Sequence, residues 1–263
     1  MVIKGVFFDF FGTLVIPWDP DLKWSEWYPS VYSLYKKNGI DIHYKDFNFI
    51  CKTFWSDSYK DSCQGLTLFE KRLLSQIESF GINASHEQIK NLAYDVSEAW
   101  FEEHFLDREA VEILEYFNKN QKTALITNFD HPPFIRTMLN RYSIANLFDS
   151  VIISGDVGVK KPVPEIFLPA LAETGLSNNE VVYVGDSIID FRAALHAGIL
   201  PILIRREGQH DPSTPGRVEP LYEKTDIQLH ELSLTGQIDI IPSLSQLKNV
   251  LKKYSAEKTH IMK

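Results

Sequence analysis

The sequence predicts a doubly wound α/β fold with a parallel sheet at its core and an all-helical segment inserted after the first strand. Six short runs of Val, Ile, Leu and Phe recur along the chain, and helical patterns lie between most of them. Residues 17–104 lack a clear strand pattern but carry several helix signatures. We therefore expect the α/β core at residues 1–16 and 105–263, and the helical insert at residues 17–104.

The six apolar runs have the length and composition of parallel strands that are buried on both faces. Each run is continuous rather than alternating with polar residues, as expected when helices cover both sides of a sheet. The predicted strands are residues 4–8, 123–126, 150–153, 181–184, 201–204 and 238–241.

Helices are predicted where apolar residues recur at helical spacing between the strands. Gly198 is a typical end for the third of these helices. Ser243 and Gln246 have the spacing of a capping box and predict the start of the last one. The predicted core helices are residues 108–118, 164–174 and 190–197, and one that follows residue 243.

The insert carries its own helix signals. Pro29 suits a first helical turn, and the Asn-Gly pair at residues 38–39 predicts the end of that helix. Ser85 and Gln88 form a second capping-box pattern, which predicts a helix running toward His104.

Composition and charge narrow the function class. The chain has 263 residues, a net charge of −8 and only two cysteines. Net negative charge disfavours nucleic acid and anionic membranes as partners. The apolar N-terminus is interrupted by Asp9, so neither a signal peptide nor a membrane span is expected, and we expect a cytoplasmic protein. The stretch 205–236 is predicted to be a long loop.

Polar side chains gather where the predicted strands end. Asp9 follows the first strand and Thr127 with Asn128 follows the second. Asp186 and Asp190 follow the fourth, and Lys161 lies in the preceding connection. Ligands of doubly wound sheets bind beyond these carboxyl ends, so these side chains are expected in one site.

These residue types indicate attack by a carboxylate on an anionic electrophile. Asp9 would be the nucleophile, and Thr127 and Lys161 would hold the oxygens on which charge develops. Asp186 and Asp190 would bind a divalent cation, and hard oxygen ligands favour Mg²⁺. Without a cation, the crowded carboxylates would repel each other and the substrate.

Four motifs in order identify a resemblance. FFDFFGTL, LITN, VGVKKPVPEIF and VGDSIID resemble the haloacid dehalogenase (HAD) superfamily, and the insert is similar to its C1-type cap. The resemblance implies an Mg²⁺-dependent phosphohydrolase that forms an aspartyl-phosphate on Asp9 from a small phosphate ester. It also implies that Asn128 helps Thr127 and Lys161 to bind the substrate. The implied metal ligands are Asp9, the Phe11 carbonyl and Asp186, with Asp190 in support.

The first motif departs from the pattern of the family's phosphatases. They carry an aspartate as general acid/base where this chain has Phe11, which cannot transfer a proton. Such acid/base help contributes roughly 10²- to 10⁴-fold in rate. We therefore expect either a substrate with a good leaving group or a substitute acid, for which Asp19, Asp130, His131 and His210 are candidates.

Three alternatives stay open. The family's dehalogenases carry an aromatic residue at the position of Phe11, but they lack the Gly-Asp of the fourth motif and use no metal. They also have a tyrosine at the position of Phe167 and an arginine early in the cap, where this chain has none before Arg72. The second alternative is a module that has lost catalysis and binds a phospho-ligand or a protein partner. The third is a phosphonate hydrolase, for which no cap lysine stands out.

Two arginines allow two interpretations. Arg205 and Arg206 follow the fifth strand at the same edge of the sheet. They either reach a second anionic group of the substrate or lie in solvent without such a role.

Overall fold

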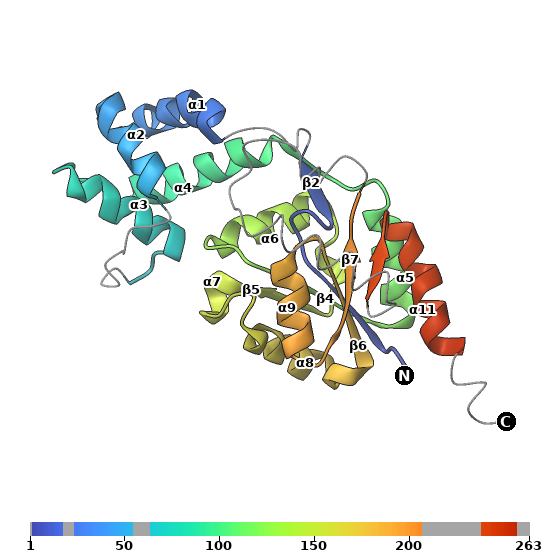
Figure 1. Ribbon diagram of the computed structural model, residues 1–263. Helices are drawn as coiled ribbons and strands as arrows, with labels where there is room; N and C mark the ends of the chain where they lie inside the picture. The colour runs from blue at the N-terminus through green and yellow to red at the C-terminus, as the bar shows by residue number, and fades with distance from the viewer. Residues whose placement is uncertain (1, 18–23, 55–63, 207–237, 257–263) are drawn as a thin grey trace.

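The computed structural model describes residues 2–17, 24–54, 64–206 and 238–256, and its centre is a six-stranded parallel sheet (Figure 1). The strand order is β5-β4-β1-β6-β7-β8, so the chain winds outward from β1 first to one side and then to the other. The predicted α/β fold class is confirmed. The strands are β1 (Gly5–Phe8), β4 (Lys122–Thr127), β5 (Ser150–Ile153), β6 (Val181–Gly185), β7 (Leu200–Ile204) and β8 (Asp239–Ile241).

Helices cover both faces of this sheet, which explains its continuous apolar strands. Val6 and Phe8 pack into one apolar cluster, while Phe7 between them packs into another on the opposite face. The first face is covered by α5 (Ala110–Asn120), α6 (Pro132–Arg141) and α11 (Leu247–Ala256). The second is covered by α8 (Leu168–Thr174) and α9 (Ile188–His196), and the short helix α7 (Ser154–Val157) follows β5.

Four helices between β2 and β3 form a lobe beside the sheet (Figure 1). They are α1 (Trp24–Lys37), α2 (Tyr44–Thr53), α3 (Leu68–Ser79) and α4 (His86–Phe101). Their apolar faces share a separate cluster that includes Tyr35, Phe47, Ile77 and Leu92. The lobe therefore has its own core, as a segment of this size requires.

A two-stranded antiparallel ladder joins the lobe to the sheet. β2 (Val15–Pro17) pairs with β3 (His104–Leu106), and Pro17 lies opposite His104. Both strands have three residues and were not predicted. The helix expected to run toward His104 ends at Phe101 instead, because His104 belongs to this ladder.

Other local predictions had mixed outcomes. The Ser85–Gln88 capping box is present, and Gly198 ends α9 with a left-handed backbone. Pro29, however, lies inside α1 rather than in its first turn, because the helix begins five residues earlier. Ser243 makes no capping bond, and a short 3-10 turn, η4 (Leu244–Gln246), precedes α11. Residues 207–236 of the predicted loop lie outside the described residues.

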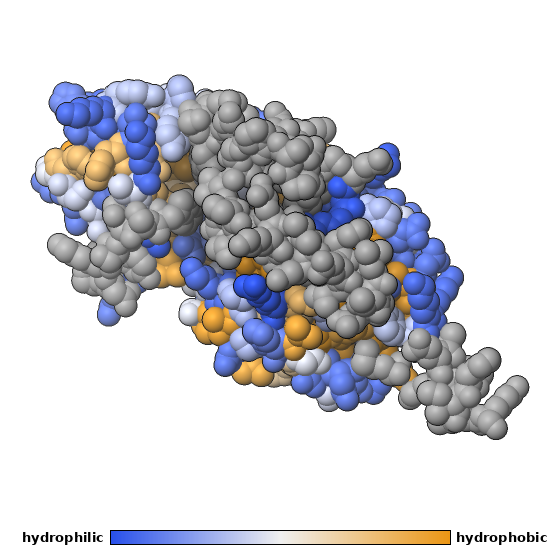
Figure 2. All heavy atoms as spheres, in the orientation of Figure 1, coloured by the Kyte–Doolittle hydropathy of each residue, from blue (hydrophilic) through white to orange (hydrophobic). Residues whose placement is uncertain are grey.

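The surface is mixed in character. In Figure 2, hydrophobic side chains are interspersed among hydrophilic ones over the described part of this face. Leu168 and Leu195, for example, are 59% and 53% exposed on α8 and α9. None of the helices in the described ranges combines the length and apolarity needed to cross a membrane.

Candidate active site

Three site residues lie where neighbouring strands end. Asp9 directly follows β1, Thr127 is the last residue of β4, and Asp186 directly follows β6. Because β1 lies between β4 and β6, these three positions meet at the carboxyl edge of the sheet. The register of the parallel strands therefore assembles the site.

The ammonium group of Lys161 lies at the centre of the site. This side chain, on the loop after α7, is only 5% exposed. Its Nζ donates to Asp9 Oδ1 at 2.5 Å, to Asp190 Oδ1 at 2.6 Å and to the Ile126 carbonyl at 3.2 Å. Burial alone would lower the pKa of Lys161, but the charges of Asp190 and Asp9 raise it above its usual range, so the group is a cation.

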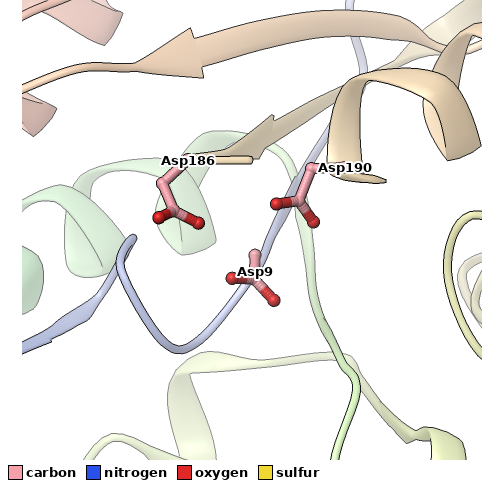
Figure 3. Close-up of side chains that lie close together, drawn as sticks. All are labelled: Asp9, Asp186 and Asp190. Atoms are coloured by element: carbon pink, nitrogen blue, oxygen red, sulfur yellow. The ribbon is translucent and has the colours of Figure 1, made fainter. Parts of the chain in front are cut away.

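The carboxyl groups of Asp9, Asp186 and Asp190 lie close together (Figure 3). Each offers an oxygen within 4.8 Å of the other two. Burial, together with the charge of Asp190, raises the pKa of Asp9 to about 7, although Lys161 lowers it in part. Burial and the two neighbouring carboxylates raise the pKa of Asp186 to about 8. The cluster therefore favours binding of either protons or a cation.

Asp190 is held by its own helix. Ser187 caps α9, and Asp190 completes the capping box by accepting from the Ser187 backbone N–H at 3.0 Å and from the Ser187 hydroxyl. Burial opposes ionisation, but Lys161 and the Ser187 bonds lower the pKa of Asp190 below its usual value. Because both of its oxygens are bonded, Asp190 is a fixed anion beside Lys161.

Two glycines allow the carboxylates to approach so closely. A Cβ added to Gly12 would lie 2.1 Å from Asp186 Oδ2, and the backbone φ of Gly12 is +82°. A Cβ added to Gly185 would lie 2.4 Å from the Cβ of Asp190. Any larger residue at either position would displace an acid of the site.

Thr127 and Asn128, which follow the second predicted strand, lie in different surroundings. Thr127 is buried at the end of β4. The side-chain amide of Asn128 pairs with the backbone of Lys161, because its Oδ1 accepts from the Lys161 N–H at 2.9 Å and its Nδ2 donates to the Lys161 carbonyl at 3.0 Å. Asn128 therefore fixes the loop that carries the ammonium group, and its binding of substrate stays a prediction.

Comparison with known families agrees with this geometry. A family model described as haloacid dehalogenase-like hydrolase matches residues 3–198. The chain belongs to this family. The match includes the three acids and Lys161, so the resemblance to this family that the four motifs indicated is confirmed, while the C1 type of the cap stays a prediction.

Relatives of this HAD-like hydrolase differ in their named activities. Two solved structures share its fold at identities that support nothing beyond the fold. A 2-haloacid dehalogenase from Pseudomonas syringae pv. Tomato DC3000 is 20% identical, with a TM-score of 0.62 over 96% of this chain and 100% of that chain. A HAD phosphatase from Thermococcus onnurineus is 22% identical, with a TM-score of 0.57 over 95% and 98% of the two chains.

A closer match in sequence is confined to part of the chain. A glyceraldehyde 3-phosphate phosphatase from Methanopyrus kandleri is 42% identical over 74 residues, which are 28% of this HAD-like hydrolase and 32% of that relative. The chain thus spans about a third of the length of that curated relative.

Phe11 of this HAD-like hydrolase is packed among aromatic rings. Its ring centroid lies 4.7 Å from that of Trp100, at the end of α4, and 5.5 Å from that of Phe129. His104 of β3 lies beside the same group, with centroids 5.9 Å apart. The side chain at this position therefore links the turn after Asp9 to the segment that leads out of the lobe.

The candidate substitute acids fall into two groups. Asp19 and His210 lie outside the described residues. His131 is buried with its Nδ1 3.0 Å from the Thr67 hydroxyl and 3.9 Å from Glu70, while the Asp130 carbonyl accepts from the Phe69 N–H. Burial lowers the pKa of His131, although Glu70 opposes this shift. Residues 130–131 thus contact the lobe.

Two residues of the site's surroundings were missed or left open in the sequence. Tyr183, in the middle of β6, places its hydroxyl 2.8 Å from Lys161 Nζ, but its strand reads as purely apolar. Arg206 forms an ion pair with Asp107 at 2.7 Å and donates to the carbonyls of Gly12 and Thr13, both at 2.7 Å. Neither interpretation of Arg206 predicted these contacts, which stabilise the turn that follows Asp9.

The donor set of this HAD-like hydrolase fits a hard divalent cation. Each of the three carboxyl groups offers an oxygen within 4.8 Å of the other two, and Mg²⁺ prefers hard oxygen ligands of this kind. Asp9 and Asp186 would be the direct ligands, and Asp190, whose two oxygens bond to Lys161 and Ser187, would support them.

Proposed function

We propose that the protein is a Mg²⁺-dependent phosphohydrolase that transfers a phosphoryl group from a small phosphate ester to Asp9 and then to water. One observation carries the proposal. The Asp9 carboxylate contacts the Lys161 ammonium, while Asp186 contributes a second carboxylate to the same space. A nucleophile flanked by a fixed cation and by cation-binding oxygens suits a doubly charged electrophile.

The first step is displacement at phosphorus. An oxygen of Asp9 attacks the phosphorus atom, and the bond to the leaving oxygen breaks with its electron pair. Lys161 and the Thr127 hydroxyl bind the phosphoryl oxygens, on which charge develops. A bound Mg²⁺ would offset the negative charge of the carboxylates and the phosphoryl group. Water then attacks the phosphorus atom, the bond between phosphorus and the Asp9 oxygen breaks, and inorganic phosphate leaves with the protons of the water, which restores the Asp9 carboxylate.

The aromatic surroundings of Phe11 bear on the leaving group. The ring of Phe11 packs against Trp100 and Phe129, and it cannot donate a proton to a leaving oxygen. Leaving groups that need little protonation suit this arrangement, and these are aryl, enol and acyl phosphates. We propose that the substrate belongs to one of these classes.

We also propose that residues 17–104 act as a cap over the carboxyl edge of the sheet. Two observations support this role. Helices α1–α4 have their own apolar cluster, and the chain enters and leaves them through the two strands of the β2–β3 ladder. Closure of such a cap would exclude water during the first step and would select the substrate.

A metal-independent 2-haloacid dehalogenase is the second candidate, and Phe11 is the observation that favours it. Halide leaves without a proton, so the missing donor is not needed. The close approach of Asp186 to Asp9 argues against it, because a reaction that uses no metal has no need of this second acid beside the nucleophile.

The test compares the two reactions directly. Wild-type protein should hydrolyse p-nitrophenyl phosphate with Mg²⁺, and EDTA should abolish the reaction. Asp9→Asn should lower turnover by at least about a thousandfold, as loss of a nucleophile does. Asp156→Asn, which removes a surface partner of Arg136, is the matched control and should retain activity.

Other outcomes would contradict the proposal. Halide release from 2-chloropropionate without added metal would establish the dehalogenase. Mg²⁺ binding with no turnover across aryl, alkyl and acyl phosphates and haloacids would indicate a binding module.

A further inference from the structure

Tyr183 is buried beneath the site, and the mechanism above does not use it. Its side chain is 1% exposed and projects to the face of the sheet opposite that of Val182 and Val184. Its ring meets the edge of Phe167, with centroids 4.9 Å apart and planes at 80°. This packing fixes the ring, and therefore fixes the place of the hydroxyl.

The hydroxyl of Tyr183 meets three polar groups. It lies 2.8 Å from Lys161 Nζ, 3.0 Å from the Ile126 carbonyl and 3.1 Å from Asp190 Oδ1. An ammonium group only donates, so the tyrosine oxygen accepts from Lys161, whose three protons are shared among this oxygen, the Ile126 carbonyl and the two carboxylates. Its single proton is then donated to Ile126 or to Asp190.

Lys161 needs such a partner because an ammonium group has no preferred plane. It is a compact charge on a flexible four-carbon chain, and its direction is set by what it contacts. Two of its partners are carboxylates, and one of them, Asp9, loses its charge when it forms a covalent bond. The Tyr183 oxygen and the Ile126 carbonyl are neutral and fixed, so they can hold the ammonium group in place throughout the reaction.

We infer that Tyr183 is a positioning residue that aims the Lys161 ammonium at the transferred phosphoryl group. This inference rests on the proposed function. It assigns to β6 a role besides that of carrying Asp186, and it predicts that the Tyr183 hydroxyl acts only through Lys161.

The principal test is Tyr183→Phe, which removes only the hydroxyl. With p-nitrophenyl phosphate and saturating Mg²⁺, kcat should fall by about tenfold to a hundredfold, the range expected for a hydrogen bond to a charged group. KM should change by less than about threefold, because the lost interaction stabilises mainly the transition state. Thermal unfolding measures the folded fraction, to which rates are normalised.

Tyr32→Phe is the matched control. The Tyr32 hydroxyl donates to the Ile42 carbonyl at 3.0 Å within the helical lobe, so its loss removes a comparable bond away from the site. A double-mutant cycle with Lys161→Met distinguishes a positioning role from a purely structural one, because it measures whether the two losses of turnover are additive. In the Lys161→Met background, Tyr183→Phe should cause no further loss of turnover.

The outcomes separate this inference from the proposed function. An active wild type with Tyr183→Phe indistinguishable from Tyr32→Phe would overturn the inference alone, as would additive losses in the cycle. If the wild type hydrolyses no phosphate ester, or Lys161→Met has no measurable turnover, nitrogen NMR of the lysine ammonium groups decides. A protected Lys161 signal that disappears in Tyr183→Phe supports positioning, and one that persists overturns it.

Discussion

At the scale of single residues, the site concentrates more negative charge than its one ammonium group offsets. Burial and mutual repulsion raise the pKa of Asp9 to about 7 and that of Asp186 to about 8, far above their usual value of 3.8. In the metal-free protein these groups hold protons that the unfolded chain has already released. From the usual pKa of 3.8 up to about 8, the folded state binds more protons than the unfolded state. The free energy of unfolding of the metal-free protein therefore falls as the pH rises through this window.

Mg²⁺ should therefore stabilise the protein more at pH 8 than at pH 6. At pH 6 the ion must displace protons from Asp9 and Asp186, whereas near pH 8 Asp9 is largely ionised and Asp186 is about half ionised. Thermal unfolding with and without millimolar MgCl₂ measures the shift in Tm at each pH. Asp186→Asn should remove most of the shift, and an equal shift at both pH values in the wild type would contradict the prediction.

Gly12→Ala should weaken both the fold and the cation site. Its left-handed backbone costs a non-glycine residue about 1–2 kcal/mol, and the added Cβ would push Asp186 away. Gly81→Ala is the matched control, because Gly81 has a φ of +73° and nothing within 4 Å of an added Cβ. Both variants should lose similar stability, but only Gly12→Ala should require more Mg²⁺ for half-maximal activity. Equal Mg²⁺ requirements would show that the close approach is unimportant.

At the scale of elements, the sequence predicted what depends on local pattern. The six strands were located to within one or two residues, because a strand buried on both faces reads as an uninterrupted apolar run. The acids of the site followed from strand ends. The β2–β3 ladder was missed because its strands are short and pair residues almost ninety positions apart.

Side-chain contacts that form only in the tertiary structure could not be predicted from the sequence either. Asn128 pairs with a backbone thirty-three positions away, and Tyr183 reaches Lys161 from a strand whose pattern shows only burial. Ser243 failed as a helix cap although its spacing was suitable: its hydroxyl contacts Ser245, whose N–H donates to Glu109.

Arg206→Lys tests how β7 supports the turn after the nucleophile. The guanidinium joins Asp107 to the carbonyls of Gly12 and Thr13, and a lysine cannot reproduce this planar set of donors. Because the pair is largely buried, we expect the free energy of unfolding to fall by about 1–3 kcal/mol. Denaturant unfolding measures this value. Arg136→Lys, which alters an exposed pair with Asp156, should change it by less than about 1 kcal/mol. Equal effects would refute the bracing role.

At the scale of the whole molecule, the helical lobe and the sheet contact each other along α6. The Thr67 hydroxyl at the start of α3 lies 3.0 Å from His131 Nδ1. Glu98 of α4 accepts from both terminal nitrogens of Arg141, at 2.6 and 2.9 Å. His131 precedes α6 by one residue and lies four residues after Thr127, so these contacts join the proposed cap to a strand that carries a site residue.

Weakening these contacts should shift the proposed cap toward an open arrangement. The double variant Thr67→Val, Glu98→Gln removes the bond between Thr67 and His131 and the charge of the Glu98–Arg141 ion pair, without touching the carboxyl edge of the sheet. It also removes the capping bond that the Glu70 N–H donates to Thr67 at the start of α3. If closure completes the site, KM for p-nitrophenyl phosphate should rise by about threefold to tenfold, because affinity falls with the closed fraction. Lys36→Gln, which breaks an ion pair with Asp41 inside the lobe, is the control and should leave KM unchanged. A double variant with the KM of the wild type would show that these contacts hold the lobe in place without governing access to Asp9.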